Sequence, residues 1–291
     1  MSSPSKIRKA VIPVAGFGTR VLPATKSIPK ELLTVVDRPL IQYVVDEARE
    51  AGIEHIVFVT GRGKGAIEDY FDHQVELESA LQAKNKTAIY NETMQSVLPA
   101  GGCSFTRQQQ PLGLGHAIWC ARDIVGDEPF AVLLPDVIVK GEKGCLKQMV
   151  DKYEAGANII AVEEVPHEDV NKYGIIAPKG DATGSKIEMS GMVEKPDVDK
   201  APSNLSIMGR YILQPEVFGI LANTGKGAGG EIQLTDAMAE LMNDQPFFAV
   251  TYEGESHDCG SKLGFVKANI AFAMGRDEFA SDLKDWIKSY V

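Results

Sequence analysis

The sequence predicts an α/β protein whose sheet is mixed but mainly parallel and is flanked by helices. Short apolar runs rich in β-branched residues recur at residues 9–14, 56–59 and 130–134, as expected of strands that are buried on both faces. Longer segments with apolar residues at helical spacing separate these runs. The succession of strand, long crossover and strand favours parallel pairing with right-handed connections.

Composition, net charge and cysteine usage limit the possible partners and compartment. The chain has 291 residues, of which 44% are hydrophobic, so it can form a packed core. Its formal net charge of −10 argues against bulk binding to nucleic acid. The four cysteines include no C-x-x-C pair, residues 1–6 are polar, and no run approaches the roughly 20 apolar residues of a membrane helix. We therefore expect a cytoplasmic protein with reduced thiols and no membrane association.

The first predicted strand leads into a glycine turn and a cationic loop. In the segment AGFGTR, Gly16 and Gly18 allow the backbone to turn tightly and to bring its amides close to a ligand. The loop that follows carries three cations and is stiffened by two prolines: Arg20, Lys26 and Lys30 with Pro23 and Pro29. Together these features predict a cradle for a nucleoside triphosphate. A plain surface turn remains an alternative, as does a dinucleotide-binding fingerprint, although Val21 stands where its third glycine is expected.

The next elements continue the alternation of helix and strand. A helix is expected at residues 39–51, ended by Gly52, before the strand at 56–59. The segment GRGKG that follows is not a P-loop, because Gly65 occupies the Ser/Thr position, and we interpret it as a turn between strand and helix. Residues 66–98 are polar and are expected to form two or three short helices over one face.

A third strand, at residues 102–107, leads into Gln108. A glutamine presents a donor and an acceptor on one rigid amide, so it can pair with the edge of a pyrimidine. A helix is expected to begin at Gly113 or Gly115 and to run to about Ala121. An ordinary loop before a helix is the alternative interpretation.

The strand at residues 130–134 is followed by Asp136. A carboxylate at the carboxyl end of a central strand in an open α/β sheet lies where ligands bind, and it can hold Mg²⁺, which prefers oxygen ligands. A cap on the next turn is the alternative. Asp258 precedes a glycine and a helix start, so it is the better candidate for a second Mg²⁺ ligand than its neighbour His257.

After residue 140 the pattern changes to short, partly alternating strands separated by Gly, Pro and Asp. The expected elements are a helix near 144–155, strands at 158–164, 172–177, 186–194 and 205–213, and helices at 231–242, 261–274 and 277–289. We interpret them as a second lobe or sheet extension that covers the cleft. Gly174 could let the backbone approach a sugar. Glu194 and Lys195 can both face a ligand only if their strand bends, which Pro196 permits; otherwise they form a solvated turn.

The segment GFGTRVLPATKSIPK resembles the signature of the sugar-1-phosphate nucleotidylyltransferases. The likeness to the bacterial UTP–glucose-1-phosphate uridylyltransferases continues in order through PLGLGHA, LLPDV, YGII, VEKP, APSNL, GRYIL, GEIQLTDA and SHDCG. It implies one domain over residues 1–291 with a Rossmann-like core, about 1–140 binding nucleotide and about 141–291 serving sugar binding and assembly. It also implies the reaction UTP + glucose 1-phosphate ⇌ UDP-glucose + diphosphate, Mg²⁺ as cofactor and a homodimer or homotetramer.

The resemblance also implies roles for particular residues. The uracil would be held by Ala15, Gly16, Gln108 and Gly113, and the nucleotide-binding set would be completed by Gly18, Thr19 and Glu31. The catalytic cations would be Arg20 and Lys30 on the triphosphate and Lys195 on the sugar phosphate. Glucose would contact Gly174, Glu194 and Gly209, and Mg²⁺ would be held by Asp136 and Asp258.

Three other functions compete with this interpretation. A dehydrogenase would use the strand and glycine turn, and Val21 argues against it. A nucleotide-sugar sensor on the same fold should lack a metal carboxylate or a phosphate-binding cation, and none is missing here. A thymidylyltransferase would bind thymine in place of uracil, a difference of one methyl group. Recognition of this group is worth only about 1 kcal/mol, so the residues alone do not decide between the two bases.

Overall fold

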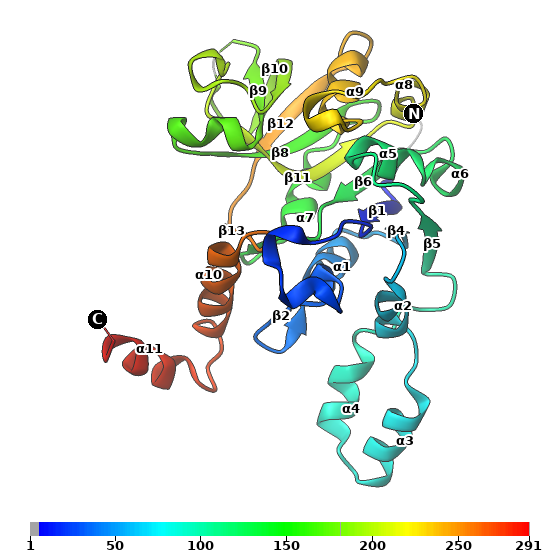
Figure 1. Ribbon diagram of the computed structural model, residues 1–291, viewed down its shortest axis with the longest axis vertical. Coiled ribbons are helices and arrows are strands. Elements are labelled where there is room, and N and C mark those ends of the chain that lie inside the picture. Colours follow the sequence, from blue (N-terminus) through cyan, green and yellow to red (C-terminus); the bar gives the residue numbers. More distant parts are fainter. Residues whose placement is uncertain (1–5, 181, 291) are drawn as a thin grey trace.

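The computed structural model describes residues 6–180 and 182–290, which form a central nine-stranded sheet with helices on both faces (Figure 1). The strands, in their order across the sheet, are β5 (Cys103–Arg107), β4 (His55–Thr60), β1 (Lys9–Pro13), β6 (Phe130–Leu133), β11 (Leu205–Leu213), β8 (Asn158–Glu164), β12 (Phe247–Thr251), β10 (Lys186–Glu194) and β9 (Gly174–Pro178). The predicted α/β fold with a mixed sheet flanked by helices is confirmed.

The direction of the strands changes across the sheet. β1 lies parallel between β4 and β6, and β5 is parallel to β4, so the first half of the chain forms a parallel block. β11 is antiparallel to both β6 and β8 and thereby joins the two halves in one sheet. β8 and β12 are parallel, whereas β10 is antiparallel to β12 and β9. The carboxyl ends of the parallel strands therefore meet at one edge, where open α/β sheets bind ligands.

Each face of the sheet carries its own hydrophobic core, because successive strand side chains point to opposite faces. Ala10 and Ile12 of β1 belong to one core, and Val11 belongs to the other. Helices covering the first core are α1 (Leu40–Glu50), α7 (Cys145–Asp151) and α10 (Lys262–Ala273). Helices covering the second are α5 (Leu114–Trp119), α8 (Val217–Leu221) and α9 (Leu234–Leu241).

The remaining elements lie around this sandwich, and some of them contribute side chains to its two cores. The helices α2 (Gly65–Phe71), α3 (Val75–Ala83) and α4 (Thr87–Met94) form an arm that extends from the end of the sheet near β4, and α11 (Ala280–Lys288) projects beyond α10 (Figure 1). The others are short 3-10 helices, α6 (Arg122–Val125) and two small antiparallel pairs, β2 (Thr34–Val35) with β3 (Arg38–Pro39) and β7 (Val137–Lys140) with β13 (Glu255–Asp258). Among the described helices, none combines the length and hydrophobicity needed to cross a bilayer.

Two differences from the predicted elements have a physical cause. The helix expected from residue 231 begins only at Leu234, because the backbone of Ile232 pairs with the start of α5 and the loop before it. Its N–H donates to Leu112 O at 2.7 Å and its carbonyl accepts from Gly115 N at 2.9 Å. β12 is absent from the predicted elements, since a five-residue apolar run fits a strand and a buried helical turn equally well.

Candidate functional site

The glycine turn lies at the carboxyl end of β1 and is folded back on its own loop. Gly18 is in the left-handed region, with φ of 66°, and a Cβ there would lie 3.0 Å from Lys30 Cβ. Thr25 Oγ1 donates to Gly18 O at 2.8 Å and closes the loop over the turn. Glycine at this position therefore allows Lys30 to pack against the turn and to reach the sheet edge.

A cavity of about 480 Å³ opens beside this turn and brings together the residues predicted to bind nucleotide, apart from Glu31. The predicted residues that line it are Ala15, Gly16, Gly18, Thr19, Arg20, Lys30, Gln108, Gly113 and Asp136. We call it the nucleotide cavity. Gly113 has φ of 108°, and a Cβ there would come within 2.7 Å of Glu231 Cβ and Ile232 O, so only glycine fits against the extended segment before α9.

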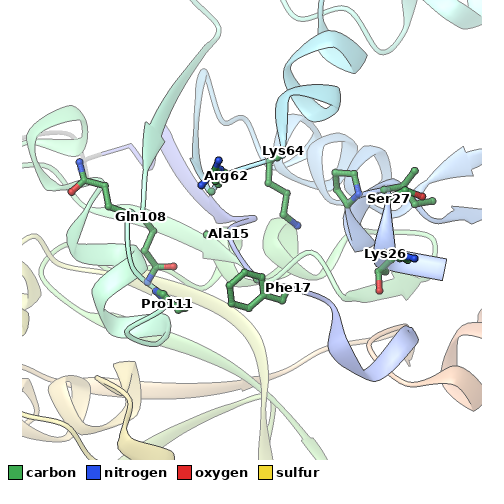
Figure 2. A pocket seen from close by; sticks show the side chains of 15 residues that line it. Ala15, Phe17, Lys26, Ser27, Arg62, Lys64, Gln108 and Pro111 are labelled. Carbon is green, nitrogen blue, oxygen red and sulfur yellow. The ribbon is translucent and has the colours of Figure 1, made fainter. Parts of the chain in front are cut away.

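The nucleotide cavity continues into a smaller space of about 280 Å³ that shares Ala15, Gly16 and Gln108 with it. Figure 2 shows this extension, with Gln108 and Pro111 on one side and Lys26 and Ser27 on the other. Its wall includes two cations that sequence reasoning assigned to a simple turn, Arg62 and Lys64. Their role could have been suspected from the sequence, because GRGKG comes directly after a central parallel strand.

Glu31 lies beneath this wall instead of in it. Its side chain is 1% exposed, and Glu31 Oε2 accepts a hydrogen bond from Lys64 Nζ at 2.8 Å. Burial raises the pKa of the Glu31 carboxyl above its ordinary value, although the ammonium groups of Lys64 and Lys30 oppose this rise. Within the described part of the chain, Glu31 Oε1 is buried without a hydrogen-bond partner. Glu31 thus anchors Lys64, which lines the extension of the nucleotide cavity.

Asp136 and Asp258 converge at the sheet edge. Lys30 Nζ lies 2.8 Å and Arg20 Nη2 3.4 Å from Asp136 Oδ2. Burial alone would raise the pKa of the Asp136 carboxyl, but these two cations hold it below its ordinary value. A Cβ placed on Gly260 would lie 2.9 Å from Asp258 Oδ1 and 3.1 Å from Asp136 Oδ2, so the two oxygens are no farther apart than the sum of these distances.

The loop that carries Asp136 is held by Arg210, a residue that sequence reasoning missed. Arg210 is fully buried; its guanidinium donates to Leu134 O at 3.0 Å and to Val137 O at 2.8 Å, the carbonyls on either side of the Pro135–Asp136 step. It also pairs with Glu47 of α1 through Nε and Nη2, at 3.0 and 2.8 Å. The available signal was an arginine in the middle of the apolar run LSIMGRYIL.

A third cavity, of about 580 Å³, contains the residues predicted to contact sugar. Gly174, Glu194, Lys195, Gly209 and Asp258 all line it, and we call it the sugar cavity. Glu194 Oε2 accepts from Thr235 Oγ1 at 2.8 Å, which fixes the carboxylate. A Cβ on Gly174 would lie 3.1 Å from that same oxygen, and one on Gly209, whose φ is 69°, would lie 2.9 Å from Leu134 Cδ1. Larger residues at the two glycines would therefore crowd the cavity wall.

The strand bend that would turn both Glu194 and Lys195 to one side is present. Lys195 has φ of 47°, a left-handed conformation that is uncommon outside glycine. Its N–H donates to Tyr173 O at 2.9 Å, which holds the bend, and its ammonium lies 3.7 Å from Glu194 Oε1. The Lys195 side chain remains 54% exposed, so its charge is accessible to a ligand. Strained non-glycine backbone of this kind is concentrated at functional sites.

The nucleotide and sugar cavities meet at Arg20 and Asp136, which line both of them. A ligand in each cavity would therefore present its near end to the same guanidinium and carboxylate. Among the described residues there is no cluster of three or more His, Cys, Asp or Glu side chains suited to a metal ion. Two carboxylates with substrate phosphates and water are nevertheless the usual surroundings of Mg²⁺, so the donor set fits that ion.

Known proteins resemble this chain over nearly its whole length. The family model described as "Nucleotidyl transferase" matches residues 9–274. A UTP–glucose-1-phosphate uridylyltransferase from Bacillus subtilis (strain 168) is 50% identical over 287 residues, which cover 98% of this chain and 98% of that protein. A second relative of the same name, numbered 2, from Staphylococcus saprophyticus is also 50% identical, over 97% of this chain and 98% of its own length.

Two solved structures share the fold closely. A structure described as UTP-bound UGPase from Acinetobacter baumannii superimposes with a TM-score of 0.89 at 48% identity and covers 97% of this chain and 98% of its own. A UDP-glucose pyrophosphorylase complexed with UDP-glucose superimposes with a TM-score of 0.82 at 42% identity, over 93% of this chain and all of that one.

Proposed function

This chain belongs to the nucleotidyl transferase family, and on that premise we propose that it transfers the uridylyl group of UTP to glucose 1-phosphate, with UDP-glucose and diphosphate as products. The observation that carries the proposal is the meeting of the nucleotide and sugar cavities at Arg20 and Asp136. The relatives support the choice of substrates, since their names specify UTP and glucose 1-phosphate and the solved structures contain UTP or UDP-glucose.

The nucleotide cavity would bind UTP with its base near Gln108 and its phosphates near the glycine turn. Ala15, Gly16, Gln108 and Gly113 would hold the uracil, and the backbone at Gly18 and Thr19 would approach the triphosphate. Arg20 and Lys30 would bind the triphosphate and stabilise the departing diphosphate. Glu31 would act indirectly, because its partner Lys64 lines the extension of this cavity.

The sugar cavity would orient glucose 1-phosphate for attack on the α-phosphate. Gly174, Glu194 and Gly209 would contact the glucose, and Lys195 would hold its phosphate. This phosphate is the nucleophile, and with a second pKa near 6 it is largely deprotonated at neutral pH, so no general base is required. The main work of these residues would be to hold the two reactants in line.

The remaining obstacle is electrostatic, since one anion must approach another. Two unit charges 4 Å apart repel by about 1 kcal/mol in water and by about 4 kcal/mol at an effective dielectric constant near 20. Arg20, Lys30 and Lys195 would offset this repulsion. In the structure Arg20 and Lys30 are paired with Asp136, so we infer that they exchange this partner for phosphate oxygens when substrates bind.

We further propose that Asp136 and Asp258 hold Mg²⁺ together with substrate phosphates. The convergence of their oxygens around Gly260 supports this assignment. When bound, the ion would neutralise phosphate charge and help to align the phosphates. Cys259 N donates to Asp136 O at 2.7 Å, so the two acidic loops are tied together by backbone as well.

We propose that the chain works as one domain, with residues 1–140 serving the nucleotide and 141–291 serving the sugar and assembly. The single sheet that contains strands from both halves supports this.

We also propose a homodimer or homotetramer. In α10 the buried residue is Ala268, whereas Leu263, Val266 and Ile270 are exposed, as expected of a helix that packs on another chain. The four free cysteines support a cytoplasmic location.

A diphosphate-release assay tests the central proposal. It would use a panel of UTP, dTTP, CTP, ATP and GTP against glucose 1-phosphate and other sugar 1-phosphates, with and without Mg²⁺. We expect the highest kcat/KM with UTP and glucose 1-phosphate, and turnover only with the metal. A higher kcat/KM with dTTP would indicate a thymidylyltransferase instead, and the absence of diphosphate release with every pair would refute the proposal.

A further inference from the structure

The amide of Gln108 is held in one orientation by its surroundings. Gln108 Nε2 donates a hydrogen bond to Gly113 O at 2.9 Å and lies 3.2 Å from His116 Nδ1. A carbonyl oxygen can only accept, so the amide nitrogen and not the amide oxygen must face Gly113. No described residue donates a hydrogen bond to Gln108 Oε1, which is left for a ligand in the nucleotide cavity that Gln108 lines.

The hydrogen bond to His116 uses the second hydrogen of the same amide nitrogen. His116 Nδ1 must then be the acceptor, so the ring proton resides on its other nitrogen. The ring is stacked on Trp119, with centroids 5.9 Å apart, and Cys120 Sγ lies 3.9 Å from Nδ1. Burial lowers the pKa of His116 below its ordinary value, which favours the neutral ring that this role requires.

His116 itself does not line the nucleotide cavity or its extension, so its effect on a base must pass through Gln108. Resting on the function proposed above, we propose that His116 is a positioning residue that determines the choice of base. Together with Gly113 O, His116 Nδ1 keeps the carbonyl oxygen of Gln108 toward the base.

The orientation of the amide decides which pyrimidine can pair with Gln108. Uracil carries a hydrogen on N3 and donates it to a carbonyl oxygen, whereas N3 of cytosine is an acceptor and would oppose the same oxygen. A flipped amide would place Gln108 Oε1 against Gly113 O, a contact between two acceptors, and would require His116 to move its ring proton to Nδ1. A site that holds a polar group in one orientation discriminates against a substrate that cannot pair with this group, because the group then loses its hydrogen bond. His116 therefore favours UTP over CTP.

Two substitutions at His116 separate hydrogen bonding from ring stacking. His116→Phe keeps an aromatic ring for Trp119 but has no acceptor, and His116→Asn places a carbonyl oxygen close to the position of Nδ1 but has no ring. We would measure kcat/KM for UTP and CTP with glucose 1-phosphate, and the binding of each nucleotide by calorimetry. We expect the UTP-to-CTP ratio to fall by about threefold to tenfold in His116→Phe, the contribution of one hydrogen bond, and to stay within about twofold of the wild-type ratio in His116→Asn.

A wild-type ratio in His116→Phe would overturn the inference, because the acceptor would then be dispensable. An equal fall in both variants would also overturn it, because the ring and not the acceptor would be the cause. Failure of the proposed function is a separate result: the wild-type protein would then neither release diphosphate from UTP nor bind UTP in preference to CTP. A wild-type protein that prefers UTP while His116→Phe keeps that preference refutes only the role of His116.

Discussion

Replacing Arg210 with methionine should destabilise the protein strongly and loosen the loop that carries Asp136. The guanidinium is fully buried, donates hydrogen bonds to both carboxylate oxygens of Glu47 and donates to the carbonyls of Leu134 and Val137. Methionine fills much of the volume but leaves the Glu47 carboxylate buried without its counter-ion. Removing one partner of a buried ion pair costs about 3–5 kcal/mol, and we expect Arg210→Met to fall in this range.

Urea unfolding followed by circular dichroism measures this cost. With a denaturant slope of about 3 kcal/mol/M, the expected loss lowers the midpoint by about 1–1.7 M. Adding Glu47→Gln to Arg210→Met should recover part of it, because a neutral amide costs less to bury and can still accept the hydrogen bond that Leu146 N donates to Glu47. Arg8→Met, which breaks an exposed pair with Glu54, is the matched control and should hardly shift the midpoint.

The same variant tests the link from Arg210 to Asp136. Both carbonyls that Arg210 holds flank Asp136, so the folded fraction of Arg210→Met should need more Mg²⁺ for half-maximal turnover, whereas Arg210→Lys should be intermediate. A loss of less than about 1 kcal/mol in Arg210→Met, or no recovery in the double variant, would show that the buried charge pair does not dominate the effect on stability.

Three further predictions concern the cavities. Lys195→Ala should raise the KM for glucose 1-phosphate more than the KM for UTP in steady-state assays; equal effects on both would remove Lys195 from the sugar phosphate. Asp136→Asn should lower Mg²⁺-dependent kcat by about a hundredfold or more while circular dichroism shows the folded protein, and retained turnover would reject Asp136 as a ligand. Gly113→Ala should weaken UTP binding in calorimetry, because its Cβ would overlap Glu231 and Ile232; unchanged affinity would show that the loop adjusts.

Much of the site follows from short stretches of the sequence. The strand at residues 9–14, its glycine turn and its cationic loop are adjacent in the chain, so apolar runs and glycine conformations predict them directly. Asp136 is predictable for the same reason, since it comes directly after a buried central strand. The resemblance in the later motifs indicated the sugar-side residues. Strand alternation together with Pro196 indicated that Glu194 and Lys195 could both face a ligand only across a bend, which the structure has at Lys195.

The pairing of groups that are far apart in the chain became known from the three-dimensional structure. Arg210 and Glu47 are 163 positions apart, Lys64 and Glu31 are 33 apart, and neither pairing has a local pattern that predicts it. The amide of Gln108 acquires its orientation from groups that are closer in the chain, Gly113 and His116, five and eight positions away, once the loop between them has folded. The physical reason is one of range: backbone preference and burial periodicity act between neighbours, whereas the pairing of buried charges depends on how helices and strands pack together.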